Sequence, residues 1–560
     1  MNDLDHYRYL ALAADQSAEA LLKLQRLEEG DPLRGSVEVP ARGYDCASTG
    51  AGVARELIVA YYLPGGRYWH QAELLSRAEL GIRYTLSQEK DDGTYDLLET
   101  NFHDGAQTSF IVQIIGPAVL LMRKMMGDSA EEKSLFSLLM HFMNRAADGI
   151  VAGGFHTPNH RWVLSAALGM CWELTGRQDC LDKMNALLNE GIDCDEEGEY
   201  TERSSGVYNI VCDRAFITMA ETLGMTDKLE YVRRNLNMVT RYFEPDLTVN
   251  TMNSVRQDAG TSPDWRIYYG LYLYMALRTG DKVYRWIADK MLEQSLGGVS
   301  WAGRQSGHGN ILGFEYFPFL LMEGGWKAWD RNDVCAPDFR FEKHFVHSGI
   351  VRLRRDDFSM TLMENSPVFA RLQYKNHAAS LRLAGTFYAQ GQFAAETIEK
   401  TEVGYRLTYR RRWGYKSPLP ERQATSEWRK MDHSRRADVM MQDFVFDVEV
   451  TPLESGASLR VRTRGVESVL IKFEILLEPG ANYITDDVFL RSRPGDYLLQ
   501  KCASAVYQYD DRTRLCIRGG CFKQSYARNM RGSVPGDDKS FFVAMTADTP
   551  MDQTFELTFS

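Results

Sequence analysis

Four side chains in two segments of this sequence have the chemistry needed to remove a proton next to a carboxylate. Asn159 and His160 are adjacent, and Arg203 and Tyr208 follow within the segment Thr201–Tyr208. An amide and a guanidinium can neutralise a sugar carboxylate, an imidazole or phenolate can take the proton from the neighbouring carbon, and a phenol can protonate the departing oxygen. This set predicts β-elimination at a uronate, a reaction for which we expect neither a metal nor an organic cofactor.

Each half of this set also has an ordinary structural interpretation. Pro158 followed by Asn159 is typical of a helix start, so Asn159 could be only an N-cap and His160 only a first-turn residue. Tyr208 could be only a tyrosine packed at the start of the next helix. Because both halves fall on the same side of neighbouring helical hairpins, we favour the functional interpretation.

Polar and aromatic residues in neighbouring loops are candidates for substrate binding. The amide, imidazole and guanidinium groups would bind the carboxylate or nearby hydroxyls, and the indoles would stack on sugar rings. The alternatives are well hydrogen-bonded loops for the polar residues and a place in the core for the tryptophans. The candidates are Asn101, His103, Gln107, Arg256, His308, Trp265 and Trp301.

Residues 1–330 have the pattern of helices arranged in hairpins. Short connections between helices carry Gly followed by Asp, as in Gly127-Asp128 and Gly280-Asp281. Gly suits a left-handed helix stop and Asp suits the next N-cap. These marks recur at roughly 50-residue intervals, a period typical of stacked helix pairs. Longer polar connections alternate with the short ones and therefore share one rim, where loops of this length are usually functional. The first domain is predicted to be an (α/α) toroid.

From residue 341 to residue 560 the pattern changes to period two. Val346–Arg354 and Ala457–Thr463 alternate polar with apolar positions and carry β-branched residues. Such segments recur at short spacing to the end of the chain and predict an antiparallel β-sandwich. The polar stretch 330–340 is the predicted linker. The fold class is therefore an α+β multidomain protein, with a helical toroid followed by a β-sandwich.

Composition and charge limit the partners. The chain has 560 residues, 44% of them hydrophobic and 25% charged, which is typical of a globular protein too long for one core. A formal charge of −11 argues against a nucleic acid partner, because the phosphate backbone would be repelled. It permits an acidic sugar, because a few local donors can hold one carboxylate and distant charge is screened beyond about 8 Å.

Cysteine usage and the N-terminal segment bear on the compartment. The nine scattered cysteines include no Cys-x-x-Cys pair, so neither a zinc ribbon nor a disulfide framework is predicted. We recognise no secretory pattern at the N-terminus and no stretch apolar enough to span a membrane. We therefore expect a cytoplasmic protein without a membrane partner, although the sequence is also compatible with a secreted protein that has lost its leader. Homo-oligomerisation stays open.

The helical hairpins, the β-sandwich and the order Asn-His, Arg, Tyr together resemble polysaccharide lyases of the α/α-toroid plus β-sandwich type. This group includes alginate lyases, chondroitin lyases and heparinase II/III-like enzymes. Asn159, His160, Arg203 and Tyr208 match the order and approximate spacing of alginate-type members. The resemblance implies that Asn159 and Arg203 neutralise the carboxylate, that His160 is the base or a carboxylate partner, and that Tyr208 is the acid and, in one variant, also the base.

Two further stretches and one departure refine this resemblance. Gly93–His103 and Leu381–Phe393 look similar to segments of lyases that act at rhamnosyl-glucuronate linkages. Some members carry a second catalytic histidine on a later loop, for which only His308 is a candidate here. If the C5 hydrogen and O4 share one face, as in glucuronate, Tyr208 can be both base and acid; if they are on opposite faces, His160 must be the base.

Other functions on the same architecture remain open. A glycoside hydrolase would need two carboxylates about 5–9.5 Å apart, and Asp92, Asp104, Glu202 and Asp258 are candidates on the rim. A C5-epimerase would share the proton abstraction, and a non-catalytic carbohydrate-binding protein would share only the cleft. Product analysis separates these functions, because only a lyase leaves an unsaturated uronate. An acidic polysaccharide or oligosaccharide is the expected partner, with D-glucuronate the expected uronate.

Overall fold

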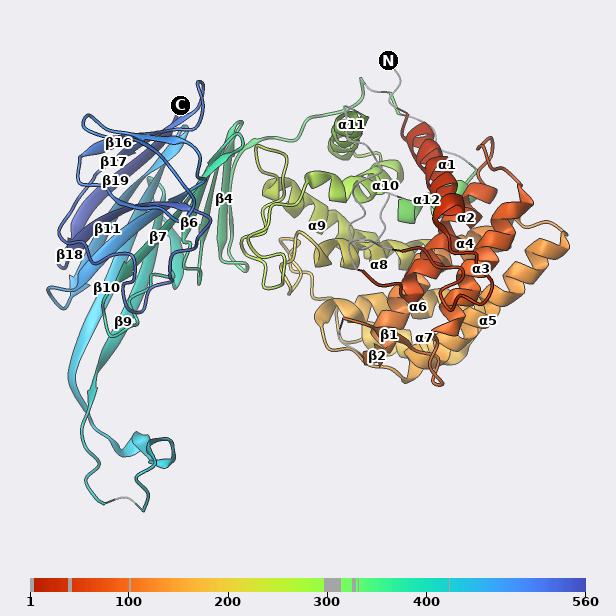
Figure 1. Ribbon diagram of the computed structural model, residues 1–560, viewed down its shortest axis with the longest axis horizontal. Helices are drawn as coiled ribbons and strands as arrows, with labels where there is room; N and C mark the ends of the chain where they lie inside the picture. The colour runs from red at the N-terminus through yellow and green to blue at the C-terminus, as the bar shows by residue number, and fades with distance from the viewer. Residues whose placement is uncertain are drawn as a thin grey trace. The chain divides into compact units, whose positions relative to one another are not determined.

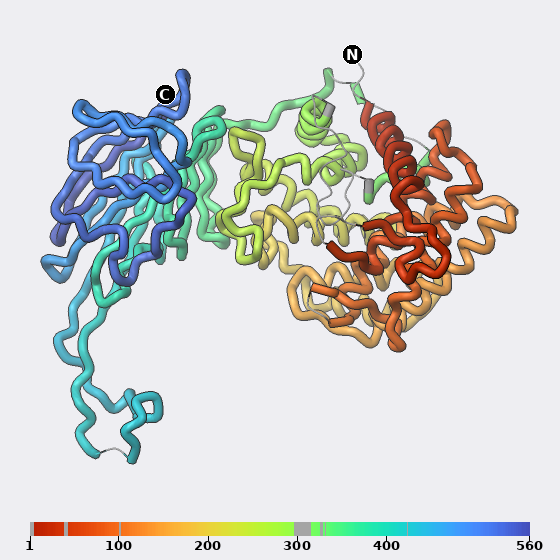
Figure 2. The backbone as a smooth tube through the Cα atoms, in the orientation of Figure 1, coloured from red at the N-terminus to blue at the C-terminus, as the bar shows by residue number. Residues whose placement is uncertain are grey.

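The computed structural model describes residues 5–38, 43–99, 102–296, 314–324, 329–330, 332–422 and 424–560. The chain divides into two compact units (Figures 1 and 2). The first unit comprises Met1–Phe243 and Thr248–Pro337, and the second comprises Glu244–Leu247 and Asp338–Ser560. The first is built of helices and the second of antiparallel sheets, so the predicted fold class is confirmed.

The helices of the first unit form successive hairpins, with α2, α4, α6, α8 and α10 packed on one another in chain order. Each of these inner helices also packs on the outer helix that follows it. Inner helices are buried nearly all round, whereas an outer helix such as α7 buries one stripe, as expected for two concentric layers. The bounds are α1 (His6–Leu24), α2 (Ala47–Tyr61), α3 (Ala72–Ser87), α4 (Gly105–Met125), α5 (Ala130–Ala152), α6 (Pro158–Thr175), α7 (Gln178–Leu188), α8 (Tyr208–Leu223), α9 (Leu229–Tyr242), α10 (Tyr269–Thr279), α11 (Lys282–Leu296) and α12 (Phe317–Met322).

Glycine ends the inner helix as predicted at three of the four Gly–Asp marks, which begin at Gly127, Gly176, Gly224 and Gly280. The predicted aspartate cap of the next helix forms at one of these four marks, where Asp281 accepts from the backbone N–H groups of Val283 and Tyr284. Gly176, Gly224 and Gly280 end α6, α8 and α10 in the left-handed conformation, with φ of 70°, 68° and 70°. These stops return the chain into the outer layer. The mark at Gly127 differs, because α4 ends in an extended Met126 and the serine at position 129 caps the following helix.

Helix α4 is more apolar than the sequence analysis recognised. By length and composition it could cross a membrane, with a mean hydropathy of 1.5 over its most apolar window, and it is the one such helix among the described residues. In the structure 83% of that window is buried inside the protein. Its apolar surface is therefore accounted for by its place in the inner layer, where α2, α6 and α12 pack against it.

The second unit is a sandwich of two sheets. In the described residues, one sheet has the strand order β14-β13-β16-β17-β19-β11-β10-β9-β8 and the other the order β15-β18-β12-β7-β6-β5-β4-β3. Neighbours are antiparallel except β15 and β18. The bounds are β3 (Arg340–Phe345), β4 (Ile350–Arg355), β5 (Phe358–Met363), β6 (Ala370–Tyr374), β7 (His377–Gly385), β8 (Thr397–Lys400), β9 (Tyr405–Lys416), β10 (Asp438–Leu453), β11 (Gly456–Gly465), β12 (Leu470–Leu477), β13 (Asn482–Ile484), β14 (Phe489–Arg491), β15 (Tyr497–Leu499), β16 (Ser504–Gln508), β17 (Arg514–Arg518), β18 (Phe541–Asp548) and β19 (Asp552–Phe559).

The period-two alternation seen in the sequence builds the sandwich core. Val448 and Val450 of β10 are buried between the sheets, while Glu449 between them points to the other face. Phe473 of β12 stacks on Phe555 of β19, with ring centroids 4.3 Å apart. The two units divide at Pro337 and Asp338, inside the predicted linker. The assignment of residues 244–247 to the second unit was not anticipated.

Candidate active site

Three inner helices begin on the same rim of the helical unit, because successive inner helices run in the same direction. Asp104 is the N-cap of α4, His160 lies in the first turn of α6, and Tyr208 is the first residue of α8. The long connection between α9 and α10 adds Arg256 and Gln257 to this rim. Helix N-termini carry partial positive charge, so this rim favours a negatively charged ligand.

Arg256 is the centre of the contacts on this rim. Its Nη1 lies 3.2 Å from Oε1 of Glu202, and its Nη2 donates a hydrogen bond of 3.4 Å to the Tyr208 hydroxyl oxygen. Its guanidinium carbon also lies 4.7 Å from the centroid of the Tyr208 ring. Gln257 Nε2 donates a second hydrogen bond to the same hydroxyl at 2.7 Å. One cation and one amide therefore converge on the phenolic oxygen. We call Glu202, Tyr208, Arg256 and Gln257 the rim cluster, and we add His160, which is linked to it through the charge of Arg256.

Asn159 supports the rim cluster from inside the protein. Its side chain is fully buried, and Nδ2 donates a hydrogen bond of 2.6 Å to Glu202 Oε2. Its backbone N–H donates to the same oxygen at 3.2 Å. The prediction that Asn159 neutralises a substrate carboxylate is therefore wrong for this structure, since its amide is inaccessible and already holds a carboxylate of the protein. Through Glu202, it fixes Arg256.

His160 is neutral at ordinary pH in this environment. Burial lowers its pKa from 6.5 to about 4, the charges of His156 and Arg256 act in the same direction, and Asp104 opposes them. Its ring makes edge contacts with His156 and Phe110, with centroids 4.7 and 5.9 Å away. Nδ1 is buried and has no hydrogen-bond partner among the described residues. A neutral imidazole of this kind can accept a proton.

Arg203 contributes a backbone turn at the entrance of α8. Its φ is 48°, in the left-handed region, and its N–H donates to the Tyr200 carbonyl at 2.8 Å. The guanidinium that contacts Tyr208 belongs to Arg256, which the sequence placed among the substrate-binding candidates. A role for Arg203 in neutralising the carboxylate stays a prediction.

A buried aspartate locks together the two loops that carry Tyr208 and Arg256. Asp258 accepts hydrogen bonds from the hydroxyls of Ser204 and Ser254, at 2.8 and 2.6 Å, and from the backbone N–H of Gly206 at 2.9 Å. A Cβ at Gly206 would lie 2.8 Å from Asp258 Oδ2, so only glycine fits this close approach. The two loops are therefore held in one geometry.

A second buried acid lies beneath the loop that carries Arg256. Glu199 accepts hydrogen bonds from the Tyr242 hydroxyl at 3.0 Å and from Asn253 Nδ2 at 3.1 Å. Burial raises its pKa to about 7, against the effect of these hydrogen bonds. Through its hydrogen bond with Asn253, which precedes Arg256 by three residues, Glu199 holds the loop that carries Arg256.

The remaining predicted binding residues are distributed differently. His103 lies on β2 (Phe102–Asp104), with Nδ1 2.5 Å from the Thr94 hydroxyl and 3.6 Å from Asp92 Oδ2. Gln107 is half-buried in the first turn of α4, where its backbone N–H donates to Asp104. Neither contact involves the rim cluster, so sugar binding by these residues stays a prediction. Three further candidates, Asn101, Trp301 and His308, lie outside the described residues.

Trp265 does not stack on a sugar. Only 1% of its side chain is exposed, its ring makes an edge contact with Phe243, and its Nε1 donates to Gln294 at 2.6 Å. The prediction for Trp265 is therefore wrong: its proximity to a rim loop in sequence concealed a place in the core, which is the commoner fate of a tryptophan beside an apolar helix.

Sequence reasoning missed two members of the rim cluster. Glu202 was considered only as a hydrolase carboxylate, and its contact with Asn159 could not be read from residues 43 positions apart. Gln257 was not singled out, and its sole signal was its position next to Arg256 in a rim loop. Within the described ranges, no three His, Cys, Asp or Glu side chains come close enough to hold a metal ion.

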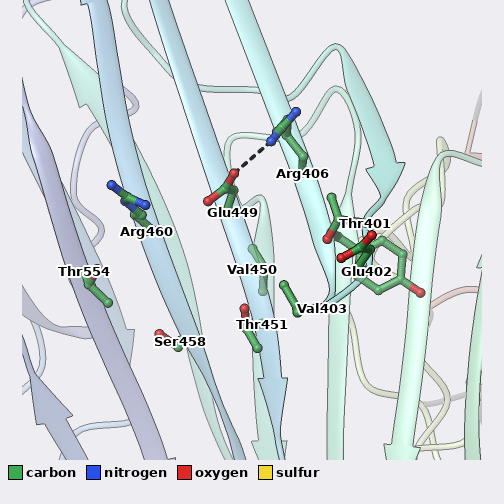
Figure 3. Close-up of a pocket in the computed structure, with 11 residues that line it drawn as sticks. Thr401, Glu402, Val403, Arg406, Glu449, Val450, Thr451, Ser458, Arg460 and Thr554 are labelled. Atoms are coloured by element: carbon green, nitrogen blue, oxygen red, sulfur yellow. Dashed lines mark hydrogen bonds and ion pairs between the residues drawn. The ribbon is translucent and has the colours of Figure 1, made fainter.

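A separate groove of about 450 Å³ lies on the second unit (Figure 3). Its polar lining includes Arg406 and Glu449, which form an ion pair of 2.9 Å across neighbouring strands. Tyr405, which also lines it, donates its hydroxyl to Glu342 at 2.7 Å. No histidine is among the residues lining this groove, and its tyrosine and this arginine are both engaged, so it does not offer the acid–base chemistry of the rim cluster.

Comparison with known proteins finds similarities among solved structures. No protein-family model and no curated protein matches the chain. Among solved structures it is similar to a Paenibacillus xanthan lyase, with 9% identity and a TM-score of 0.48 over 98% of this chain and 55% of that chain. It is similar to heparinase III, with 11% identity and a TM-score of 0.48 over 98% of this chain and 84% of that chain.

A chondroitin AC lyase from Streptomyces coelicolor A3 is also similar, with 11% identity and a TM-score of 0.48 over 100% of this chain and 80% of that chain. This chain spans little more than half the length of the xanthan lyase, as the 55% coverage states. At identities of 9–11% and TM-scores of 0.48, these similarities assign no role to this chain.

Proposed function

We propose that this protein is a lyase that cleaves the glycosidic bond at C4 of a uronate by β-elimination, leaving a 4,5-unsaturated uronate. The substrate we propose is an acidic polysaccharide or oligosaccharide. One observation carries the proposal: Arg256 and Gln257 both donate to the Tyr208 hydroxyl oxygen, in a cluster whose histidine, His160, is neutral.

The elimination requires positive charge near the uronate carboxylate, because removal of the C5 proton produces an enolate-like dianion. Arg256 is half-buried, so part of its guanidinium is accessible while the rest contacts Glu202 and Tyr208. The N-termini of α6 and α8 add partial positive charge at the same rim. Loss of one donor to a developing oxyanion typically costs about 2.7–4 kcal/mol, so this term dominates the rate.

Tyr208 is the proposed acid and, for glucuronate, also the proposed base. In glucuronate the C5 hydrogen and O4 share one face, so one group can take the proton and deliver it to the leaving oxygen. To act as the base, Tyr208 enters the reaction as a phenolate, whose negative charge the donors Arg256 and Gln257 stabilise. The phenolate takes the C5 proton and becomes a phenol, and it then gives this proton to O4 as the C4–O4 bond breaks, which restores the phenolate. For a uronate with the opposite configuration, neutral His160 is the proposed base. D-glucuronate, linked to rhamnose, is our proposed sugar because of the segments Gly93–His103 and Leu381–Phe393.

A hydrolase would need two carboxylates that face each other across the scissile bond. Asp258 is buried and accepts three hydrogen bonds from the protein, and Glu202 is buried between Asn159 and Arg256. Both acids hold the site together, which argues against these two candidates. Asp92 and Asp104 remain the carboxylates on which the hydrolase alternative would have to rest.

The proposal is tested by replacing Tyr208 with Phe. Tyr208→Phe retains the ring under Arg256 but removes the oxygen that would transfer the proton. We expect the ultraviolet absorbance of unsaturated products from glucuronate-containing glycans to disappear, with thermal unfolding unchanged. Tyr274→Phe is the matched control, because Tyr274 also contacts an arginine and a glutamate in this unit. Wild-type activity in Tyr208→Phe would reject the proposed function.

A further inference from the structure

Strands β9 and β10 continue beyond the sandwich as a two-stranded ribbon (Figures 1 and 2). β8 pairs with β9 only as far as Thr408, and β11 pairs with β10 only from Phe444 onward. We call the segment Arg410–Met441 the arm. Its strands pair with each other and with no other strand of the described chain. At about 3.3 Å per residue, the ribbon extends roughly 20 Å before its tip begins.

The arm exposes several large apolar side chains. Trp413, Tyr415, Trp428 and Met440 are 47%, 56%, 64% and 72% exposed. An isolated two-stranded ribbon is only marginally stable in water, and clustered exposed aromatics usually mark an interaction site. Tryptophan, tyrosine, methionine and arginine are the residues enriched in protein interfaces, and three arginines precede Trp413 directly. The composition is therefore that of a protein-binding surface.

The tip of the arm is folded upon itself. His433 and Arg436 both contact the Trp428 ring, at 4.3 and 4.9 Å, and His433 Nε2 lies 2.7 Å from the Trp428 carbonyl oxygen. Arg436 also donates to the Ser417 carbonyl at 3.1 Å, which ties the tip to the end of β9. A preorganised tip loses little conformational freedom on binding, which favours docking into a complementary surface.

The arm is basic although the protein is acidic. Between Arg410 and Met441 the sequence has nine arginines and lysines against four acidic residues, whereas the whole chain has a formal charge of −11. The rest of the chain is therefore strongly acidic and complementary in charge to the arm. We propose that the arm docks on a second copy of this chain, so that two copies each receive the arm of the other around a two-fold axis.

The placement of the charges favours a second copy over an acidic glycan. Lys416, Lys430 and Arg435 form ion pairs with acids of the arm itself, so the arm keeps a net positive charge but these three residues do not form a row of free cations along which a glycan chain could lie. The φ of 52° at Met440 and the register shift between Val439 and Gln442 interrupt the ribbon edge. This irregularity discourages strand addition, so docking uses side chains.

Sedimentation velocity of the full chain tests the proposal. We expect the wild type to sediment as a dimer at micromolar concentration. The double variant Trp413→Ala/Trp428→Ala should raise the dissociation constant at least about 30-fold, because such aromatics are typical hot spots. Phe489→Ala is the matched control, since Phe489 is 71% exposed on β14 of the same sheet but lies outside the arm, and it should remain dimeric.

A second variant guards against an effect on folding alone. Replacing residues 418–436 with Asn-Gly removes the tip, and we expect a folded monomer of about the chain mass of 63.9 kDa. Dimerisation should also weaken in about 1 M sodium chloride, because charge attraction is screened there. A monomeric wild type, a dimer that persists without the arm or in high salt, or a monomer whose arm instead binds an acidic glycan would each overturn the proposal.

Discussion

The substitution Arg256→Lys tests the central contact of the candidate site. Arg256 bridges two partners, with Nη1 3.2 Å from Glu202 and Nη2 3.4 Å from the Tyr208 hydroxyl. A lysine ammonium keeps the positive charge but is a single point donor, so it cannot reproduce the planar fork that contacts both oxygens. We therefore expect lysine to retain the ion pair with buried Glu202 and to lose the contact with Tyr208.

The expected magnitude follows from the contact that is lost. A hydrogen bond involving a charged group contributes about 1.5–3 kcal/mol, and about 1.4 kcal/mol corresponds to a tenfold change in rate. Arg256→Lys should therefore lower kcat by roughly 10- to 100-fold. Arg256→Ala should cost more, roughly 10²–10³-fold, since it removes the cation altogether. It should also destabilise the fold, because buried Glu202 would lose its charged partner.

Initial rates of unsaturated-product formation, measured by ultraviolet absorbance, provide the assay. Arg278→Lys is the matched control. The Arg278 guanidinium lies 5.2 Å from the Tyr274 ring, donates to the Tyr274 hydroxyl at 3.2 Å and pairs with Glu221 at 2.5 Å. This second Arg-Tyr-Glu set lies near the C-terminal ends of α8 and α10, the ends opposite the rim cluster.

Both lysine variants should therefore show similar changes in thermal stability, while only Arg256→Lys should lose activity. Wild-type activity in both variants would refute the assignment of Arg256 to the active site. An equal loss of activity in both variants would show that activity follows stability and not the contact with Tyr208.

Three further predictions concern groups around the rim cluster. The pKa of His160 is lowered to about 4, so the folded state favours the neutral imidazole. The contribution of His160 to the stability of the fold is therefore complete above pH 6.5 and is lost as the pH falls toward 4. We expect an NMR titration of His160 to give a pKa near 4, and a pKa near 6.5 would contradict this. We also expect the free energy of unfolding to be about 2 kcal/mol lower at pH 5 than at pH 7, and this difference should be absent in His160→Gln. The pKa of Glu199 is raised to about 7, so its contribution is complete below pH 4.5 and is lost as pH rises through 7. In chemical unfolding experiments, the pH dependence of the free energy of unfolding should therefore be smaller by roughly 3 kcal/mol in Glu199→Gln than in the wild type. The same pH dependence in both proteins would show that Glu199 is already ionised. Gly206→Ala places a Cβ 2.8 Å from Asp258 Oδ2 and should lower activity at least tenfold by shifting the loop, whereas Gly154→Ala, where a Cβ meets nothing within 4 Å, should be neutral; equal activities of the two variants would argue against the loop lock.

The fold could be predicted where its cause is local. Gly176, Gly224 and Gly280 signal helix stops because a left-handed stop depends on the residue itself. The alternation in β10 signals a sheet with one buried face for the same reason. The prediction of a left-handed stop at Gly127 was wrong because a helix can also end in an extended residue, as α4 does at Met126. Which of these two ends forms depends on packing.

The site was only partly predictable because partners are chosen by the tertiary structure. The sequence brings His160 and Tyr208 to the same rim, since the helix order alone determines which ends are neighbours. It does not say that Asn159 turns inward to Glu202, because a polar residue in the first turn of a helix can face either way. It also does not distinguish Arg203 from Arg256, since the loops that place them are fixed by Asp258.

In the proposed function, buried Glu202 has a definite role in preparing the site for an acidic substrate. Glu202 balances the charge of Arg256, so the pair by itself gives little attraction for a carboxylate at long range. What the pair gives is a guanidinium fixed against the Tyr208 oxygen before the substrate arrives. A donor already in place needs no reorganisation when charge develops in the transition state. In the proposed reaction, the contribution of the glutamate is therefore to hold the donor in place before the charge develops, and not to add attraction for the substrate.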